Sequence, residues 1–261
     1  MNWGRIAAVV VMLPCVAAAI DDVPMRFEVG SYAVNLMPTR ENVRPTISFA
    51  GKSFSFAYRT GVSAMDGDRK VVFRSDPTNV LSVLKRTAKG VRAEYVHSLH
   101  VGEGGGRRFV GTCSNEVVFA DGSVAVRATL YPAEPGRYRF HAAWKASQII
   151  VFPAYERKWV GTTLCLFKSR DVAFMNELTP PDRYDPKAWG VSVKDTGIVE
   201  RMELGNVPDV VSFSNRSKAG FFCTRYKSGF EASAVALNED PMHKPQWDKP
   251  FSFSYAIKLE M

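Results

Sequence analysis

Residues 115–132, NEVVFADGSVAVRATLYP, contain a short turn between two segments in which apolar and polar residues alternate. Alternation with a period of two is typical of a strand that buries one face. Asp121-Gly122 readily adopts the positive φ angles that a two-residue hairpin turn needs. The stretch therefore predicts two antiparallel strands joined by a tight turn.

The same alternation extends over most of the chain. About twelve to fifteen short segments alternate in this way and are bounded by turn residues. Their number and spacing predict an all-β protein, one large antiparallel β-sandwich with few short helices. Two smaller sandwiches joined near residues 132–136 are the alternative. The clearest of the other strand segments are 26–37, 53–58, 70–75, 137–144, 162–167, 210–214, 220–226 and 251–260.

Only two segments suggest helix. Residues 79–85 (NVLSVLK) and 170–177 have compositions that allow a turn or two each. Neither is long enough to stand as a major element, because short isolated helices are marginal in water.

The first nineteen residues have the pattern of a secretory signal peptide. Arg5 gives a positive n-region, an apolar run follows, and Ala17 and Ala19 stand at −3 and −1 of a cleavage site. The run is shorter than the roughly 20 residues that span a bilayer, and Pro14 interrupts it. We expect residues 1–19 to be removed and residues 20–261 to form a secreted or periplasmic β-sandwich without stable membrane insertion. An uncleaved anchor, or lipidation at Cys15, is the alternative.

Cleavage would leave three widely spaced cysteines, Cys113, Cys165 and Cys223. Three cysteines do not make a disulfide-dense scaffold. One bridge with one free thiol and three buried thiols both stay open. The sequence contains no CxxC and no Cys/His zinc pattern, so we predict neither a metal site nor a cofactor.

The net charge of +8 comes from 34 basic and 26 acidic residues. The basic pairs are spread along the chain, and no run of five like charges occurs, so nucleic acid is not a predicted partner. We expect the excess of basic residues to serve only to keep the protein surface soluble. Binding to an acidic polysaccharide or to an anionic cell envelope is the alternative.

The histidine-rich stretch 91–111, VRAEYVHSLHVGEGGGRRFVG, reads as a strand, a glycine loop and the next strand. His97 and His100 are three residues apart and therefore point to opposite faces of a strand. The glycines are not a phosphate loop, because no GK[ST] follows them. His97, His100 and His141 are nevertheless candidates for a general acid or base. His141 would share its strand face with Arg139, in a row suited to an anionic or polyhydroxyl ligand.

Two proline-rich segments, 176–190 and 238–250, break the alternation and predict long loops. Aromatic rings beside polar side chains suit sugar rings, whose C–H faces pack on them. Tryptophans that fill the ends of the sandwich are the alternative. The predicted ligand-binding residues are Tyr184, Trp189, Trp247, Arg139 and His243.

From about Leu81 to Trp144, the order KGVRAEYVHSL, NEVVFADGSVAVRATLYP and RYRFHAAW resembles the galactose-mutarotase-like supersandwich domains of exported carbohydrate-associated proteins. The resemblance is one of pattern and covers about a quarter of the chain. It implies glycan binding or an accessory role beside a glycan-active enzyme. Epimerases of that group use a histidine and a glutamate on a concave sheet face, and neither matches a definite position here.

These observations favour an exported, non-catalytic β-sandwich that binds carbohydrate or assists its processing. A carbohydrate-active enzyme on the same fold, such as an epimerase, a lyase or a glycoside hydrolase, is one alternative. The other is a structural or adhesion module of the cell envelope with a protein partner.

Overall fold

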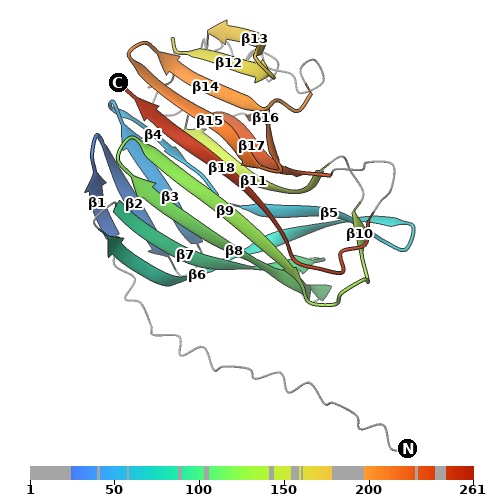
Figure 1. The fold of residues 1–261 in the computed structure, drawn as a ribbon. Helices are drawn as coiled ribbons and strands as arrows, with labels where there is room; N and C mark the ends of the chain where they lie inside the picture. The colour runs from blue at the N-terminus through green and yellow to red at the C-terminus, as the bar shows by residue number, and fades with distance from the viewer. Residues whose placement is uncertain are drawn as a thin grey trace, which may run out of the picture.

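The computed structural model describes residues 25–39, 42–57, 59–87, 90–102, 106–140, 144–153, 159, 161–177, 197–226, 229–238 and 245–261. Every regular element in these ranges is a β-strand, and all the ladders are antiparallel, which confirms the predicted all-β fold (Figure 1). No helix long and apolar enough to cross a membrane occurs in the described ranges.

The described residues form eighteen strands. They are β1 (Met25–Val29), β2 (Tyr32–Thr39), β3 (Asn42–Phe49), β4 (Lys52–Ser55), β5 (Thr60–Asp66), β6 (Arg69–Thr87), β7 (Gly90–Val101), β8 (Arg108–Ala120), β9 (Ser123–Pro132), β10 (Arg139–Phe140), β11 (Trp144–Pro153), β12 (Thr163–Lys168), β13 (Asp171–Glu177), β14 (Arg201–Asn206), β15 (Asp209–Ser217), β16 (Ala219–Tyr226), β17 (Gly229–Leu237) and β18 (Phe251–Glu260).

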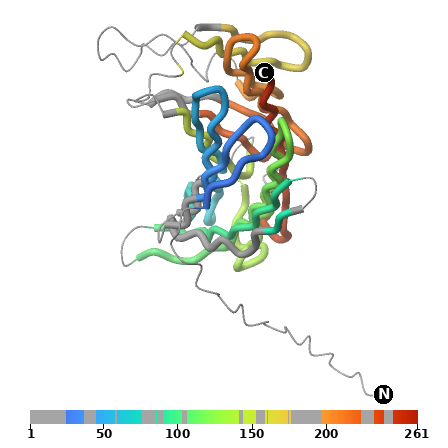
Figure 2. The backbone as a smooth tube through the Cα atoms, turned by 90° about the vertical axis from the view of Figure 1, so that its left-hand side faces the viewer, coloured from blue at the N-terminus to red at the C-terminus, as the bar shows by residue number. Residues whose placement is uncertain are grey.

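The strands form two layers. The first layer has the order β1-β2-β3-β4-β11-β17-β16. The second has the order β6-β7-β8-β9-β18-β15-β14-β12-β13, which Figure 1 shows from the lower strands to the top. Strand β5 joins them, because it pairs with both β11 and β6. Figure 2 shows the blue strands of the first layer beside the green strands of the second.

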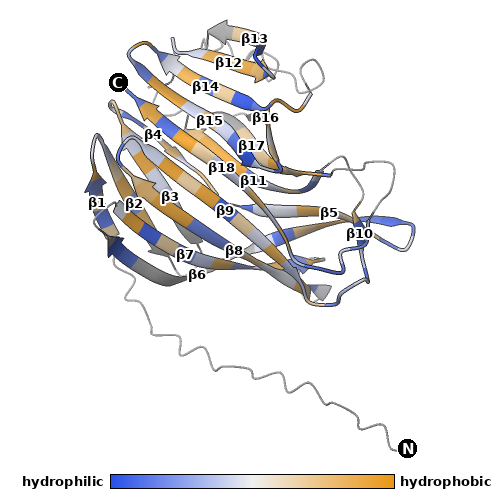
Figure 3. Ribbon diagram, viewed as in Figure 1, coloured by the Kyte–Doolittle hydropathy of each residue, from blue (hydrophilic) through white to orange (hydrophobic). Residues whose placement is uncertain are grey.

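The core lies between the layers and is strongly aromatic. The period of two puts one apolar face of each strand inward, which Figure 3 shows as alternating colours along the strands. Phe27 of β1 meets Phe119 of β8 with ring centroids 5.4 Å apart, and Phe152 of β11 meets Phe213 of β15 at 5.9 Å. Such edge-on contacts join the two sheets into one sandwich.

The predicted hairpin is present. Strands β8 and β9 pair from Gly111↔Pro132 to Ala120↔Ser123, and Gly122 has a φ of 61° in the turn. Strand β18 then pairs with β9 on its other side, from Phe251↔Leu130 to Lys258↔Ser123. The quoted stretch 115–132 therefore lies in the middle of the second layer.

The prediction of helix in two segments is wrong. Residues 79–85 belong to β6 and 171–177 form β13. Residues 79–85 pair with β7, with register shifts between Ser75 and Asn79 and between Leu81 and Val83. These shifts break the strict alternation in the sequence, which is why the segment did not read as a strand.

Candidate functional site

An open groove of about 520 Å³ lies where the start of β6, the end of β7 and the start of β8 meet. Four of its lining residues are permanently cationic, and His100 lies among them. Its described lining contains no Asp or Glu. The remaining lining is apolar or small, with Val72 46% exposed. The cationic residues are Arg69, Lys70, Arg74 and Arg107.

The alternation of β6 places the cations. Lys70 and Arg74 are exposed on the outer face, whereas Phe73 points inward and is fully buried. Across the ladder, Arg74 is in register with His100 of β7, and His100 is in register with Phe109 of β8. Three neighbouring strands thus present a cation, an imidazole and an aromatic ring side by side on the outer face of the second layer.

His100 joins the cationic and aromatic parts of the groove. Its Nδ1 lies 3.4 Å from Nη2 of Arg107. Its ring lies 5.7 Å from that of Phe109, edge to face, and Phe109 is 45% exposed beside this lining residue. A flat apolar surface beside hydrogen-bond donors suits a polyhydroxyl ring, whose C–H groups pack on the aromatic face.

Trp247 does not present its ring to a ligand. It is 1% exposed and stacks on Phe73 with centroids 6.1 Å apart. Its backbone N–H donates to the carbonyl of Tyr138 at 2.7 Å, which fastens the segment after residue 244 to the end of the sandwich. The predicted stacking of Trp247 on a sugar is therefore corrected: the ring fills the end of the core and supports β6 from below the groove.

His97 is also withdrawn from solvent. It is fully buried, and among the described residues its two ring nitrogens have no hydrogen-bond partner. Burial lowers the pKa of His97 to about 3. Its ring lies 5.4 Å from that of Tyr95, whose hydroxyl is likewise unpartnered within the described part of the chain. A ligand in the groove does not reach His97, because the two histidines point to opposite faces of β7.

A polar cluster in the core lies close to His97 and links the two layers. Gln148 of β11 donates to Oδ1 of Asn115 at 2.5 Å and to Oγ1 of Thr60 at 3.3 Å. The hydroxyl of Tyr255 donates to Oε1 of Gln148 at 3.4 Å. Burial raises the pKa of the nearby Cys113 thiol to about 12, so this thiol is unreactive at neutral pH.

The other predicted residues are placed as follows. Arg139 is exposed on β10, where it is in register with Met65 of β5. Cys113 and Cys165 are free thiols, so no disulfide joins them. Four predicted residues, and the side chain of Cys223, lie outside the described part of the structure. These four are His141, Tyr184, Trp189 and His243.

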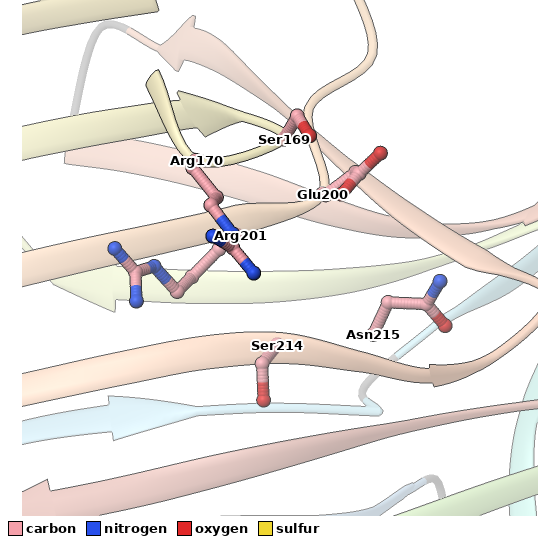
Figure 4. A pocket seen from close by; sticks show the side chains of 6 residues that line it. All are labelled: Ser169, Arg170, Glu200, Arg201, Ser214 and Asn215. Atoms are coloured by element: carbon pink, nitrogen blue, oxygen red, sulfur yellow. The ribbon is translucent and has the colours of Figure 1, made fainter. Parts of the chain in front are cut away.

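A second, smaller pocket of about 370 Å³ lies at the far side of the second layer (Figure 4). Arg201 packs over the ring of Phe167 at 3.9 Å and pairs with Glu203 at 3.3 Å. Glu200 lies in the lining, so the charges are mixed. This pocket therefore lacks the uniform positive charge of the first groove. Within the described chain, no group of three or more His, Cys, Asp or Glu residues could hold a metal ion.

No protein-family model and no curated protein matches the sequence. The fold does match solved structures. A Glycoside Hydrolase Family 97 enzyme from Pseudoalteromonas sp. strain K8, in complex with acarbose, matches with a TM-score of 0.50 and 12% identity over 90% of this chain. The chain spans only 35% of the length of that enzyme.

Two further matches cover nearly the whole of both chains. The Slr1438 protein from Synechocystis sp. PCC 6803 matches with a TM-score of 0.51 and 8% identity, over 91% of this chain and 96% of that one. A putative aldose 1-epimerase from Escherichia coli K12 matches with a TM-score of 0.47 and 8% identity, over 91% and 99%. Sequence identities this low support a similarity of fold and nothing more. At that level, which is that of the fold, the predicted likeness to galactose-mutarotase-like supersandwich domains is confirmed.

Proposed function

We propose that this protein binds carbohydrate in the groove between β6 and β8 and that it does not convert the bound sugar. The observation that carries the proposal is the exposed ring of Phe109 against His100, a lining residue of the groove that also lies beside Arg107. The solved structure of the Glycoside Hydrolase Family 97 enzyme holds the saccharide acarbose, and its resemblance to this fold supports the same ligand class.

The non-catalytic part of the proposal follows from where the histidines lie. His97 is sealed in the core, and its low pKa keeps it neutral at physiological pH. His100 contacts the guanidinium of Arg107 and the aromatic ring of Phe109, and both contacts suit the binding of a sugar ring.

A glycan array with the wild-type protein, followed by titration of the best ligands, tests binding. Phe109→Ala should weaken binding about tenfold, and Phe109→Leu should recover little of it, because stacking needs a flat aromatic face. Met175→Ala, which removes an apolar side chain that is 68% exposed on β13, is the control and should bind as wild type does. An array without any saccharide signal would contradict the proposal.

Turnover assays on sugars and polysaccharides test the non-catalytic part. We expect no conversion of any saccharide that binds. Conversion by the wild type that is lost in His100→Asn would instead establish an enzyme and would place its acid or base in the groove.

We also propose that the protein works outside the cytoplasm, after removal of residues 1–19, and that Tyr184 and Trp189 add a second sugar contact. The leader pattern and the proline-framed segment 176–190 support these two points. N-terminal sequencing of the purified protein should begin at Ile20. Saccharide titration should change the tryptophan fluorescence of the wild type more than that of Trp189→Phe.

A further inference from the structure

We infer that the groove between β6 and β8 selects acidic saccharides, those that carry carboxylate or sulfate groups. This inference rests on the proposed function and specifies its ligand class. It starts from the charge of the groove, whose described lining holds four permanent cations and no carboxylate. A neutral saccharide needs no such concentration of positive charge.

Two arginines elsewhere on the second layer differ from Lys70 and Arg74 in the groove. Arg92 lies 3.2 Å from Glu94 and 3.3 Å from Glu116, and Arg201 lies 3.3 Å from Glu203. Their charges are thus balanced by carboxylates on the same sheet face. Lys70 and Arg74 form no ion pair with a described residue, so the potential around these two cations favours anions.

The cations are spaced for more than one anionic group. Lys70 and Arg74 lie four residues apart on the same face of β6, a separation of about 13 Å at the rise of a strand. Arg107 lies on the opposite side of the groove, before β8. An extended ligand with charges at intervals can meet these cations in succession. The planar guanidinium of an arginine binds a carboxylate or a sulfate through two parallel hydrogen bonds.

The apolar part of the groove favours a saccharide over other polyanions. Val72 lies between Lys70 and Arg74 on the exposed face of β6, and the exposed ring of Phe109 packs against the lining residue His100. An acidic sugar offers the same combination, a C–H face on each ring and an anionic substituent beside it. The two apolar side chains would contact the rings while the cations hold the substituents.

The test compares three polymers of matched length: oligogalacturonate, sulfated dextran and unmodified dextran. Calorimetric titration of the full chain should give tighter binding of at least one acidic polymer than of dextran. Lys70→Gln with Arg74→Gln should weaken that binding about tenfold or more, since each lost charge-assisted hydrogen bond is strong. The two acidic polymers distinguish carboxylate from sulfate as the recognised group.

The control variant also replaces one lysine and one arginine, and both lie on the same sheet face as Lys70 and Arg74. Arg127 of β9 and Lys258 of β18 are both exposed and lie outside the groove. Arg127→Gln with Lys258→Gln should change the affinity less than about threefold, since distant exposed charges are screened by salt. Equal losses in the two double variants would show a non-specific effect of net charge and would overturn the inference.

The remaining outcomes separate this inference from the proposed function. Equal affinity for dextran and the acidic polymers, lost on Phe109→Ala, would keep carbohydrate binding and overturn the acidic selection. Binding of single-stranded DNA as tight as that of the acidic polymers would also overturn it. No binding of any polymer would contradict both proposals.

Discussion

At the residue scale, the imidazole of His97 is the clearest case of a side chain whose environment sets its chemistry. It is fully buried, lies in register with Cys113 of β8 and packs edge to face with the ring of Tyr95. Burial holds its pKa at about 3, well below the usual value of 6.5. The folded protein therefore carries this histidine in its neutral form over the physiological range.

This low pKa predicts a loss of stability in mild acid. The unfolded chain binds a proton at His97 below about pH 6.5, but the folded protein does so only near pH 3. The contribution of His97 is therefore complete above pH 6.5 and is lost as the pH falls towards 3, by up to about 1.4 kcal/mol per pH unit. Urea unfolding at pH 7.5, 6.0 and 5.0 measures the free energy of unfolding and its fall with pH.

The matched variant is His97→Leu, which keeps the volume apolar and removes the titration. Its free energy of unfolding should fall less steeply with pH than that of the wild type. Parallel curves for the two proteins would show that His97 does not cause the acid sensitivity.

At the scale of the element, Gly111 allows β8 to pass close to two neighbours. A Cβ at this position would clash with the carbonyl oxygen of Tyr131 and would lie 3.0 Å from Cη2 of Trp247. The pairing Gly111↔Pro132 at the end of the β8–β9 ladder depends on this approach. The glycine thus lets the ring of Trp247 pack directly beneath the strand that also carries Phe109.

Gly111→Ala should destabilise the protein by about 1–3 kcal/mol, the usual cost of overpacking a tight interior. Thermal unfolding followed by circular dichroism measures it. Gly51→Ala is an instructive comparison, since no atom lies within 4 Å of its would-be Cβ and only its φ of 72° opposes the change. An unchanged midpoint for Gly111→Ala would mean that Trp247 moves aside without cost.

The elements were largely predictable from the sequence, but the site was not. The period of two is local, so segments such as 115–132 and 251–260 could be recognised as strands without knowledge of their partners. Segment 79–85 could not, because the register shifts of the β6–β7 ladder change which face each residue occupies. The pairing, rather than local preference, makes this segment a strand.

The groove escaped prediction for a similar reason. Arg69-Lys70 and Arg107-Arg108 are separate basic pairs in the sequence, and only the pairing of β6, β7 and β8 brings Arg69, Lys70 and Arg107 to one groove. Trp247 read as a loop aromatic because prolines surround it. Its burial depends on Phe73 and Phe140, which lie far from it in the sequence, as well as on the nearby Phe251.

At the scale of the whole molecule, the second layer depends on β18. This strand pairs with β9 on one side and with β15 on the other, so it is central in a sheet whose other members precede it in the chain. By contrast, β13 pairs only with β12 among the described strands. Damage to β18 should therefore affect the sandwich as a whole, and damage to β13 should stay local.

Proline substitutions test this difference. Ala256→Pro breaks the ladder between Ser214 and Ala125 and should cost about 3 kcal/mol or more, which exposes two strand edges and favours aggregation. Val172→Pro, at a 54% exposed position of β13, should cost clearly less. Size-exclusion chromatography with urea unfolding measures both. Equal losses would mean that β18 is no more critical than the edge.

The central place of β18 also constrains how the chain assembles during synthesis. Thr129 and Ser252, whose hydroxyls are 2.9 Å apart in the finished sheet, are separated by 123 residues. A ribosome that adds about 5–20 residues per second needs roughly 6–25 seconds to cover that separation. Throughout this interval the edge of β9 that β18 covers in the finished sheet lacks that partner, and an unpaired strand edge invites aggregation.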